Sequence, residues 1–278
     1  MKKTTYMMLG AMVAGLIGTC AVALAYRHHC ITINRVQTLG GEEVKVGLPD
    51  VNKVVFTENW PDVGVGVSLN NFKGISVEES DTAKSSTLVT SADWLPLLKC
   101  QVDSGTLDLA VDYSAIIERY LIDKRSEYVR CKSDNFVIAK VIVPSGTLKE
   151  VEAMDKTIYL DSVKAKEIIS KVNYRLVLNN CDIQLLKGQA KRMDELKLDN
   201  SKVGEARLNV VYGNFRVKCV SDSSVIGFLY IDSLYNNAKN GYFKFEKANI
   251  NEFKYNPEDD ETVLNINMKN GVINMNNK

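Results

Sequence analysis

An eight-residue pattern recurs in the second half of the chain and constrains the fold more than any other feature. It consists of two apolar residues at spacing two, two polar residues, a small residue and, two positions further on, another apolar residue. Copies begin at Leu176, Leu196, Phe243 and Ile266, and Val220–Val225 is a degenerate copy. Steps of about 20 to 25 residues are the coil length of solenoids, whose coils bury their apolar side chains only by stacking on their neighbours.

Each copy has a direct physical interpretation as part of one coil. The two apolar residues at spacing two point inward from a strand, the polar pair turns a corner, and the small residue lies where the chain bends tightly. We therefore predict that Leu198 and Val203 point into the core. Stacked corners also align polar residues, and ladders of stacked asparagine are stabilising. The predicted corner row is Asn180, Asn200, Lys247 and Asn270, and the predicted bend row is Cys181, Ser201, Ala248 and Gly271.

The residues before the repeats also favour strands. After Pro49, short apolar runs with a period of two alternate with clusters of Asn, Asp, Ser and Gly, as in strands joined by turns. The best helical windows are Ser114–Lys124 and Val163–Val172, each two or three turns at most. The sequence thus predicts an all-β fold. The alternative is an antiparallel sandwich of hairpins, which explains the strands but not the repeat spacing.

The N-terminus has the form of an export signal. Lys2 and Lys3 precede an uncharged run over residues 6–25, which is long enough to span a bilayer. Ala23-Leu24-Ala25 is a small-residue cleavage site, so residues 1–25 are either a removed signal peptide or a retained transmembrane anchor. A lipoprotein modified at Cys20 is a weaker alternative, because Thr19 stands where a smaller residue is expected.

Three segments follow from this organisation. Residues 1–25 are the signal peptide or anchor, the polar residues 26–50 are a tether, and residues 51–278 are the folded head. We expect an exported protein in the periplasm or at the cell surface, tethered to the membrane by residues 6–25 if the signal is retained. Beyond the signal there are five cysteines, Cys30, Cys100, Cys131, Cys181 and Cys219, without the spacing of a disulfide framework or a zinc site.

Composition excludes some partners. The chain has 45% hydrophobic and 25% charged residues, and its formal net charge is +1. These values are typical of a globular protein rather than a disordered one. Without Lys2 and Lys3 the remainder carries 33 basic and 34 acidic residues. This balance argues against a nucleic-acid partner.

Residues 92–111, ADWLPLLKCQVDSGTLDLAV, resemble the early signature of the GIN-domain family, also called auto-transporter adhesin head domains. Further on, VIVPSGTLKEVEAMDKTIYL looks like the start of that family's repeating part. The resemblance covers roughly residues 50–278 and implies a single-stranded, right-handed parallel β-helix on the cell envelope, with an unknown or adhesive function. The residues that carry it are Leu95, Pro96, Leu97, Leu98, Val102, Gly105, Thr106 and Leu107, and then Val143, Pro144 and Leu148.

Motifs that could carry chemistry are weak. The two histidines, His28 and His29, lie beside Cys30 in the expected tether, too close to the apolar segment to serve a triad or a four-ligand metal site. Gly66–Asn70 nearly spells a nucleophile elbow but lacks its last glycine. Pro257–Glu261 is acidic but lacks the ligand pattern of a calcium loop. We therefore predict no catalytic, cofactor-binding or metal-binding residues, and no cofactor.

Surface features favour a binding protein. Tyr212, Tyr230 and Tyr235 could recur along one face of the stack, although partial burial is the plainer interpretation. Five aspartates lie in or next to corners, and three Asp-Ser/Thr pairs are similar to O-glycosylation acceptors or simply mark turns. The prediction is an exported, non-catalytic envelope or surface module that binds an unidentified glycan or protein. The alternatives are a polysaccharide-processing β-helix enzyme and a structural or regulatory periplasmic protein. The aspartates are Asp161, Asp182, Asp199, Asp222 and Asp232, and the pairs begin at Asp81, Asp161 and Asp232.

Overall fold

A computed structural model describes residues 15–25, 36–59, 66–121, 128–189, 193–209, 214–232, 242–256 and 263–275. Residues 15–25 are helical, and the remaining elements are almost all strands. In chain order these are β1 (Val36–Leu39), β2 (Glu43–Gly47), β3 (Lys53–Asn59), β4 (Gly66–Asn70), β5 (Gly74–Ser80), β6 (Thr87–Ser91), η1 (Leu95–Leu97), β7 (Leu98–Asp103), β8 (Thr106–Asp112), α2 (Tyr113–Tyr120), β9 (Tyr128–Ser133), β10 (Val137–Pro144), β11 (Glu150–Ala153), β12 (Thr157–Asp161), β13 (Lys164–Val172), β14 (Arg175–Asn179), β15 (Asp182–Gly188), β16 (Glu195–Asp199), β17 (Lys202–Asn209), β18 (Asn214–Cys219), β19 (Val225–Asp232), β20 (Tyr242–Asn256) and β21 (Val263–Met275).

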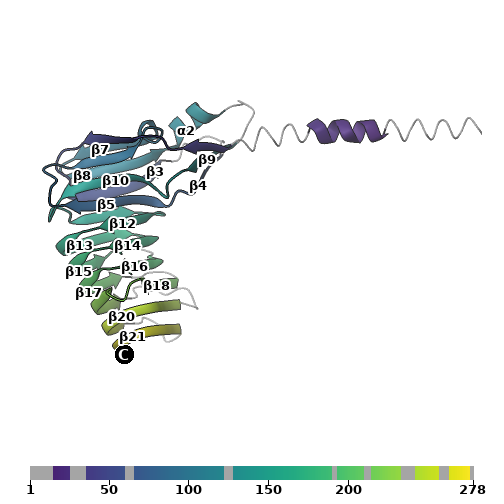
Figure 1. Ribbon diagram of the computed structural model, residues 1–278. Helices are drawn as coiled ribbons and strands as arrows, with labels where there is room; N and C mark the ends of the chain where they lie inside the picture. The colour runs from purple at the N-terminus through teal and green to yellow at the C-terminus, as the bar shows by residue number, and fades with distance from the viewer. Residues whose placement is uncertain are drawn as a thin grey trace, which may run out of the picture.

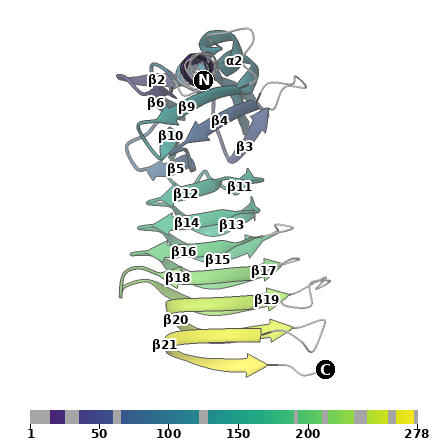
Figure 2. The same cartoon turned by 90° about the vertical axis from the view of Figure 1, so that its right-hand side faces the viewer.

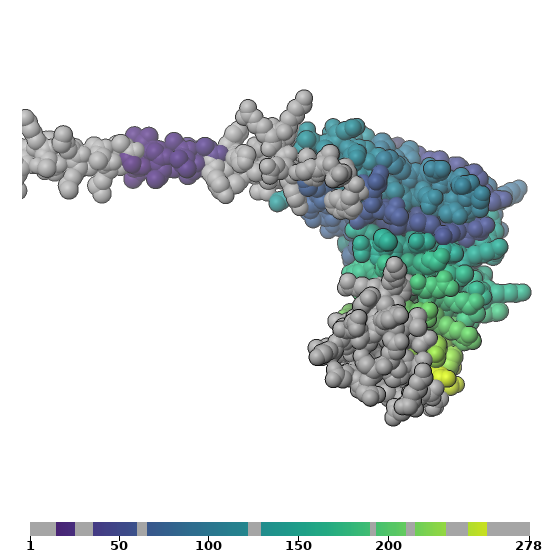
Figure 3. Space-filling model, turned by 180° about the vertical axis from the view of Figure 1, so that it is seen from behind, coloured from purple at the N-terminus to yellow at the C-terminus, as the bar shows by residue number. Residues whose placement is uncertain are grey.

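The strands form two parallel stacks that share β20. Stack I consists of β5, β12, β14, β16, β18 and the first half of β20, and stack II of β3, β11, β13, β15, β17, β19 and its second half. In both stacks each strand pairs in parallel with the strand of the next coil, and β21 pairs along β20. Figure 2 shows the coils lying one below another, and Figure 3 shows that their order in space follows their order in sequence.

The N-terminal ends of the stacks contain antiparallel pairs, so the large sheet is mixed. Strands β2, β6 and β10 form antiparallel pairs that continue stack I beyond β5, and the β7–β8 hairpin continues stack II beyond β3. A separate parallel sheet has the order β1-β9-β4, with α2 nearby (Figure 1). The residues of the predicted family signature form η1 and the β7–β8 hairpin. The expectation of one regular parallel stack over residues 51–278 is therefore met only in part: the pairing between successive coils is parallel from β11 onward, and the part before β11 is mixed.

The predicted inward positions are confirmed. Leu198 is 0% and Val203 1% exposed, and successive coils place apolar residues above and below them. These rows bury apolar surface between coils, which stabilises a stack whose single coils have no core. One row through stack I contains Leu176, Leu196, Val217 and Phe245, and one row through stack II contains Ile183, Val203, Ile226 and Ile250.

The predicted register is wrong in the coil that contains Phe243. Phe243 was expected to continue the row of Leu196. The row instead runs from Leu196 to Val217 and from Val217 to Phe245. The reason is that the corners differ in length: Phe245 and Ile250 are five positions apart, whereas the equivalent Leu196 and Val203 are seven, and in the intervening coil Val217 and Ile226 are nine. In the corner of this intervening coil Val220 is 45% exposed, so the degenerate copy marks a turn but not an inward position.

The asparagine corner row is confirmed for Asn180 and Asn200. Asn200 Nδ2 donates to Asn180 Oδ1 at 2.8 Å, and Ser223 Oγ donates to Asn200 Oδ1 at 2.8 Å. Asn180, Asn200 and Lys247 have φ values of 53°, 48° and 49°, the left-handed conformation that asparagine tolerates better than most residues. The bend row is buried, and Ser201 Oγ accepts the backbone N–H of Cys181 at 3.0 Å. The expected alignment of Asn270 and Gly271 with Lys247 and Ala248 is wrong, because in β21 Asn270 pairs with Asn249 and Met268 pairs with Ala248.

Two other expectations need correction. The tether expected over residues 26–50 contains β1 and β2, which pair with β9 and β6, so the folded part begins earlier. The helical window Val163–Val172 is the strand β13. The second helical window is confirmed in part, because α2 covers Tyr113–Tyr120. None of the helices among the described residues has the length and apolarity that crossing a bilayer requires.

The cysteines that the structure describes are free thiols. Cys100 is exposed, and Cys131, Cys181 and Cys219 are buried. Burial raises the pKa of Cys131 to about 11 and that of Cys181 to about 12. Neither thiol is therefore ionised at neutral pH, which is typical of cysteines that serve only packing. Cys30 lies outside the described residues.

Asp112 caps α2 and provides a test of this element. Its carboxylate accepts the backbone N–H groups of Ser114 and Ala115 at 3.1 and 3.4 Å and pairs with Lys99 at 2.9 Å. Burial acts to raise the pKa of Asp112, but these partners outweigh it and the pKa lies below its ordinary value.

We expect Asp112→Ala to lower the free energy of unfolding by about 1 kcal/mol at neutral pH. Because the folded-state pKa is lowered, this contribution is present above the ordinary aspartate pKa and is lost as the pH falls through the folded value. Urea unfolding of the variant and the parent between pH 7 and pH 3 measures the difference. Asp112→Asn, which retains the cap, is the control, and a difference that grows toward low pH would contradict the assignment.

Candidate functional site

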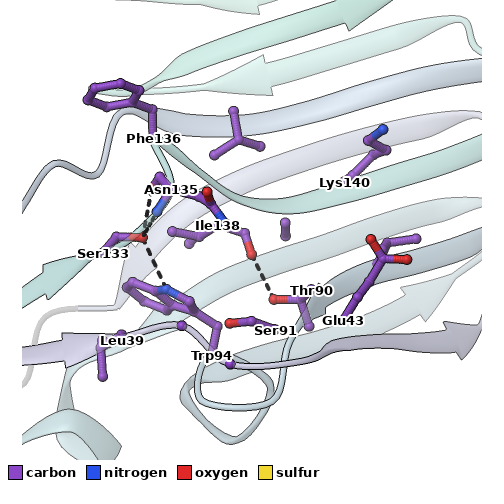
Figure 4. Close-up of a pocket in the computed structure, with 15 residues that line it drawn as sticks. Leu39, Glu43, Thr90, Ser91, Trp94, Ser133, Asn135, Phe136, Ile138 and Lys140 are labelled. Carbon is purple, nitrogen blue, oxygen red and sulfur yellow. Dashed lines mark hydrogen bonds between the residues drawn. The ribbon is translucent and has the colours of Figure 1, made fainter.

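A hollow of about 430 Å³ lies where β6 and β10 separate (Figure 4). These strands pair from Ile142↔Thr87 to Ala139↔Thr90, and beyond this point Thr90 Oγ1 donates to the carbonyl of Ile138 at 2.7 Å. The pairing of β10 with β5 shifts register between Val137 and Lys140. This bulge leaves the two consecutive residues Ile138 and Ala139 both buried. Bulges bend a strand and redirect neighbouring side chains, and here the bend opens the hollow.

One wall of the hollow is fixed by a short hydrogen-bond chain. Trp94 is 2% exposed, and its Nε1 donates to Ser133 Oγ at 3.3 Å. Ser133 Oγ in turn donates to the carbonyl of Asn135 at 2.6 Å and accepts its N–H at 3.3 Å. Buried indole and hydroxyl groups are usually satisfied in this way. The chain holds the turn between β9 and β10 and therefore the position of Phe136.

Phe136 stands at the rim of the hollow and is 55% exposed. The N–H of Lys73 donates to its carbonyl at 2.9 Å, and Lys73 Nζ lies 4.3 Å from the centroid of its ring. A cation over an aromatic face is attracted to it. The ring is thus presented to solvent in a prepared position. Because the ring already holds one position, binding of a partner over it would cost little side-chain entropy of Phe136.

Charged groups lie at the other end of the hollow, away from Phe136 (Figure 4). They are Glu43, from β2, and Lys140, from β10. Lys140 Nζ pairs with Glu78 at 2.9 Å, and the hydrogen bond to Glu78 raises the pKa of Lys140. Among the described residues, the hydroxyl of Ser91 is buried without a hydrogen-bond partner. The hollow thus combines apolar walls with a few polar groups, which is typical of binding sites for small or extended ligands.

The weak chemical motif that the structure describes, Gly66–Asn70, does not lie at this hollow. Gly66–Asn70 forms β4 of the three-stranded sheet, where Ser68 Oγ lies 3.5 Å from Asn70 Oδ1. His28, His29 and Cys30 are outside the described residues, as is the acidic run 257–261. Within the part of the chain that is described, no three His, Cys, Asp or Glu side chains are grouped so that they could hold a metal ion. The expectation of no catalytic, cofactor or metal residue stays a prediction.

The acidic and aromatic candidates are dispersed. Asp161 and Asp199 end strands of stack I, and Asp182 begins β15 of stack II. Ser162, which follows Asp161, has a φ of 57° at a corner, so this Asp-Ser pair does mark a turn. Tyr230 is half-buried in β19 with Lys254 Nζ 5.8 Å from its ring centroid. Asp222 lies in a turn, and Tyr212, Tyr235 and the side chain of Asp232 are outside the described part.

Comparison with known proteins gives no family. No family model matches the chain, and no curated protein matches it. Among solved structures, the chain is similar to a putative adhesin from Bacteroides fragilis, at 14% identity and a TM-score of 0.45, with 86% of this chain and 98% of that chain covered. A putative adhesin from Parabacteroides merdae has 13% identity and a TM-score of 0.36 over 87% of this chain and 100% of that chain. A putative lipid binding protein from Parabacteroides distasonis has 14% identity and a TM-score of 0.35 over the same shares.

Proposed function

We propose that this chain is an exported, non-catalytic binding module of the cell envelope or cell surface, adhesin-like in its role. The observation that carries the proposal is Phe136, an exposed aromatic ring held in place beside a hollow. Aromatic residues in prepared positions dominate the binding energy of many interfaces. We infer that an apolar group of the partner packs against Phe136 and enters the hollow, and that Thr90 and Ser91 contribute hydrogen bonds.

The N-terminal segment supports export. Residues 15–25 are helical, and their apolar side chains lie open to solvent. An exposed apolar helix of this kind is typically covered by a membrane or by the export machinery. We propose that this segment directs export to the periplasm or cell surface, as a cleaved signal or a retained anchor. The exposed fractions are 68% for Leu16, 64% for Ile17, 70% for Val22 and 65% for Leu24.

The stacks also support a finer statement of the fold. We infer that from β11 onward the two stacks form a single-stranded, right-handed parallel β-helix. The pairing of each strand with the strand two positions along the chain supports this, because successive coils then continue in one direction. The strong preference of parallel strand connections for the right-handed form supports the hand.

Phe136→Ala tests the proposed site. We expect the purified protein to bind at least one component in a screen of envelope polysaccharides and host matrix proteins. Loss of an aromatic anchor costs about 2 kcal/mol, so the variant should bind it about thirtyfold more weakly. Because the ring is exposed, the melting temperature should not change. Surface plasmon resonance with each component measures the affinity.

Met154→Ala provides the matched control, because Met154 is also a large, exposed apolar residue, at 66%, but does not line the hollow. It should leave the affinity unchanged. If both variants lost affinity equally, the binding would depend on exposed apolar side chains in general and not on the Phe136 hollow. Turnover of any polysaccharide in the screen would contradict the non-catalytic role and favour the enzyme alternative. Binding to no component would favour a structural or regulatory role.

A further inference from the structure

A second concave region lies along the first residues of the stack II strands β13, β15, β17 and β19, which we call the bend of stack II. It is separate from the Phe136 hollow. Strand β11 pairs with β13 only from Glu150↔Ile169 onward. The first residues of β13 therefore lie against β15 on one side and against the turn between β10 and β11 on the other. A hollow of about 540 Å³ lies between this turn and β13, lined by Gly146, Leu148, Lys149, Lys164, Ala165, Lys166, Glu167 and Ile169.

A second hollow of about 370 Å³ continues the first along the same bend. Lys164 of the first hollow pairs in register with Asp182, which pairs with Lys202, which pairs with Val225. The two hollows therefore form one line across consecutive coils, which we call the bend groove. The second hollow is lined by Asp182, Ile183, Gln184, Lys202, Val203, Gly204, Val225 and Gly227.

Glycines let the backbones of successive coils approach closely at the second hollow. A Cβ on Gly227 would lie 2.4 Å from the carbonyl oxygen of Gly204, and a Cβ on Gly204 would lie 2.8 Å from that of Gln184. Neither distance is compatible with a side chain, because real Cβ atoms do not approach oxygen so closely. Glycine is found where backbones come this near to each other. Gly204 and Gly227 therefore contribute backbone atoms, without side chains, to the floor of the second hollow, where an extended ligand could lie.

The rim of the bend groove is basic. Lys149, Lys164, Lys166 and Lys202 are all exposed, and none of their ammonium groups forms an ion pair with a carboxylate of the described residues. Two acidic residues face them. Glu167 is already paired with Lys187 at 2.9 Å, so the exposed carboxylate on the groove surface that can offset the four lysines is that of Asp182.

A buried carboxylate holds the upper part of the groove in shape. Glu79 is 4% exposed, and its Oε1 accepts the N–H groups of Gly146 at 3.1 Å and Leu148 at 3.4 Å. Its Oε2 accepts the N–H of Lys164 at 2.8 Å. One side chain therefore joins both walls of the first hollow. Hydrogen bonds from three backbone donors satisfy this buried charge and fix the relative positions of the Lys149 turn and the start of β13.

We propose that the bend groove binds an extended acidic polysaccharide. Coils repeat about every 4.8 Å along the stack, so the lysines offer positive charge at several heights to a ligand that carries carboxylates at regular intervals. The backbone floor and Gln184 suit the hydroxyl groups between the charges. Single-stranded nucleic acid would need aromatic stacking platforms, and the residues that line the groove include no aromatic side chain. This proposal goes beyond the Phe136 hollow and does not depend on it.

Polygalacturonate is the probe for this proposal, with dextran as a neutral polymer and poly-L-glutamate as an acidic polypeptide. We expect calorimetric titration to show that polygalacturonate binds and that its affinity falls as salt screens the charges. The quadruple variant K149Q/K164Q/K166Q/K202Q should bind at least about tenfold more weakly, because each exposed charge pair contributes modestly and the four add. Its circular dichroism and melting temperature should match those of the parent.

A second quadruple variant, K132Q/K197Q/K218Q/K247Q, removes the same charge from lysines elsewhere and should retain the affinity. Equal loss in both quadruple variants would overturn the proposal, because net charge alone would then explain binding. Dextran binding as tightly as polygalacturonate, no binding of polygalacturonate, or tighter binding of poly-L-glutamate would also overturn it. Phe136→Ala should bind polygalacturonate normally, which separates this test from that of the Phe136 hollow.

Discussion

Replacing Leu198 with aspartate is expected to destabilise the stacks by about 4 kcal/mol or more. Leu198 is 0% exposed in β16, with Leu178 paired to it on one side and Cys219 on the other. The new carboxylate would find apolar neighbours in both adjacent coils. An unpaired buried charge is among the few single changes with an effect of this size. Urea unfolding followed by circular dichroism measures the loss.

Lys197→Asp is the matched control, because Lys197 precedes Leu198 in the same strand and is only half-buried on the outer face. It should change the free energy of unfolding by about 0.5 kcal/mol or less. Leu198→Ala should fall between the two, at about 3 kcal/mol, since it leaves a cavity without a charge. A melting curve for Leu198→Asp that matches the parent would show that this residue does not point inward.

The sequence predicts the stacks because the spacing of apolar residues within one coil is set by neighbouring positions in the chain. Two apolar residues at spacing two identify the inward face of a strand, and repeats identify the coils. Where a strand bends, the rule changes. In β13, Lys166 and Glu167 both face outward, so the buried Ile168 follows the partly buried Ala165 at spacing three. That spacing is also the spacing of a helix face, and it explains why Val163–Val172 was predicted as helical.

The Phe136 hollow could not be predicted in this way. Its wall depends on Trp94, Ser133 and Phe136, which come from two segments separated in sequence by β7, β8 and α2. It opens because antiparallel β6 pairs with β10 next to a bulge in β10. Neither the pairing nor the bulge belongs to a repeated sequence pattern, so neither can be recognised from the sequence. The signal in the sequence is faint: Phe136–Ala139 is an unbroken apolar run, which by itself is also typical of an ordinary buried strand.

Gly74→Ala is expected to have an effect comparable to that of a buried charge, for a steric reason. Gly74 is buried in β5, between Val137 of β10 and Thr157 of β12. A Cβ at this position would lie 1.7 Å from the carbonyl oxygen of Thr157. Overpacking a core costs about 1 to 3 kcal/mol when side chains can move aside. The obstacle here is backbone, which cannot rotate away, so we expect about 3 kcal/mol or more in urea unfolding.

Gly47→Ala is the control for Gly74→Ala, because Gly47 is also a strand glycine but a Cβ there would meet nothing within 4 Å. It should leave stability within about 0.5 kcal/mol of the parent, since alanine restricts the unfolded chain without a clash in the folded one. The Gly74 variant should also disturb the Phe136 hollow, because the N–H of the adjacent Lys73 donates to the carbonyl of Phe136 at 2.9 Å and the carbonyl of Lys73 accepts the N–H of Thr157 at 2.9 Å. Pushing β5 and β12 apart therefore strains the strand that holds the ring. Equal unfolding curves for the two glycine variants would mean that β5 and β12 are not in close backbone contact at this point.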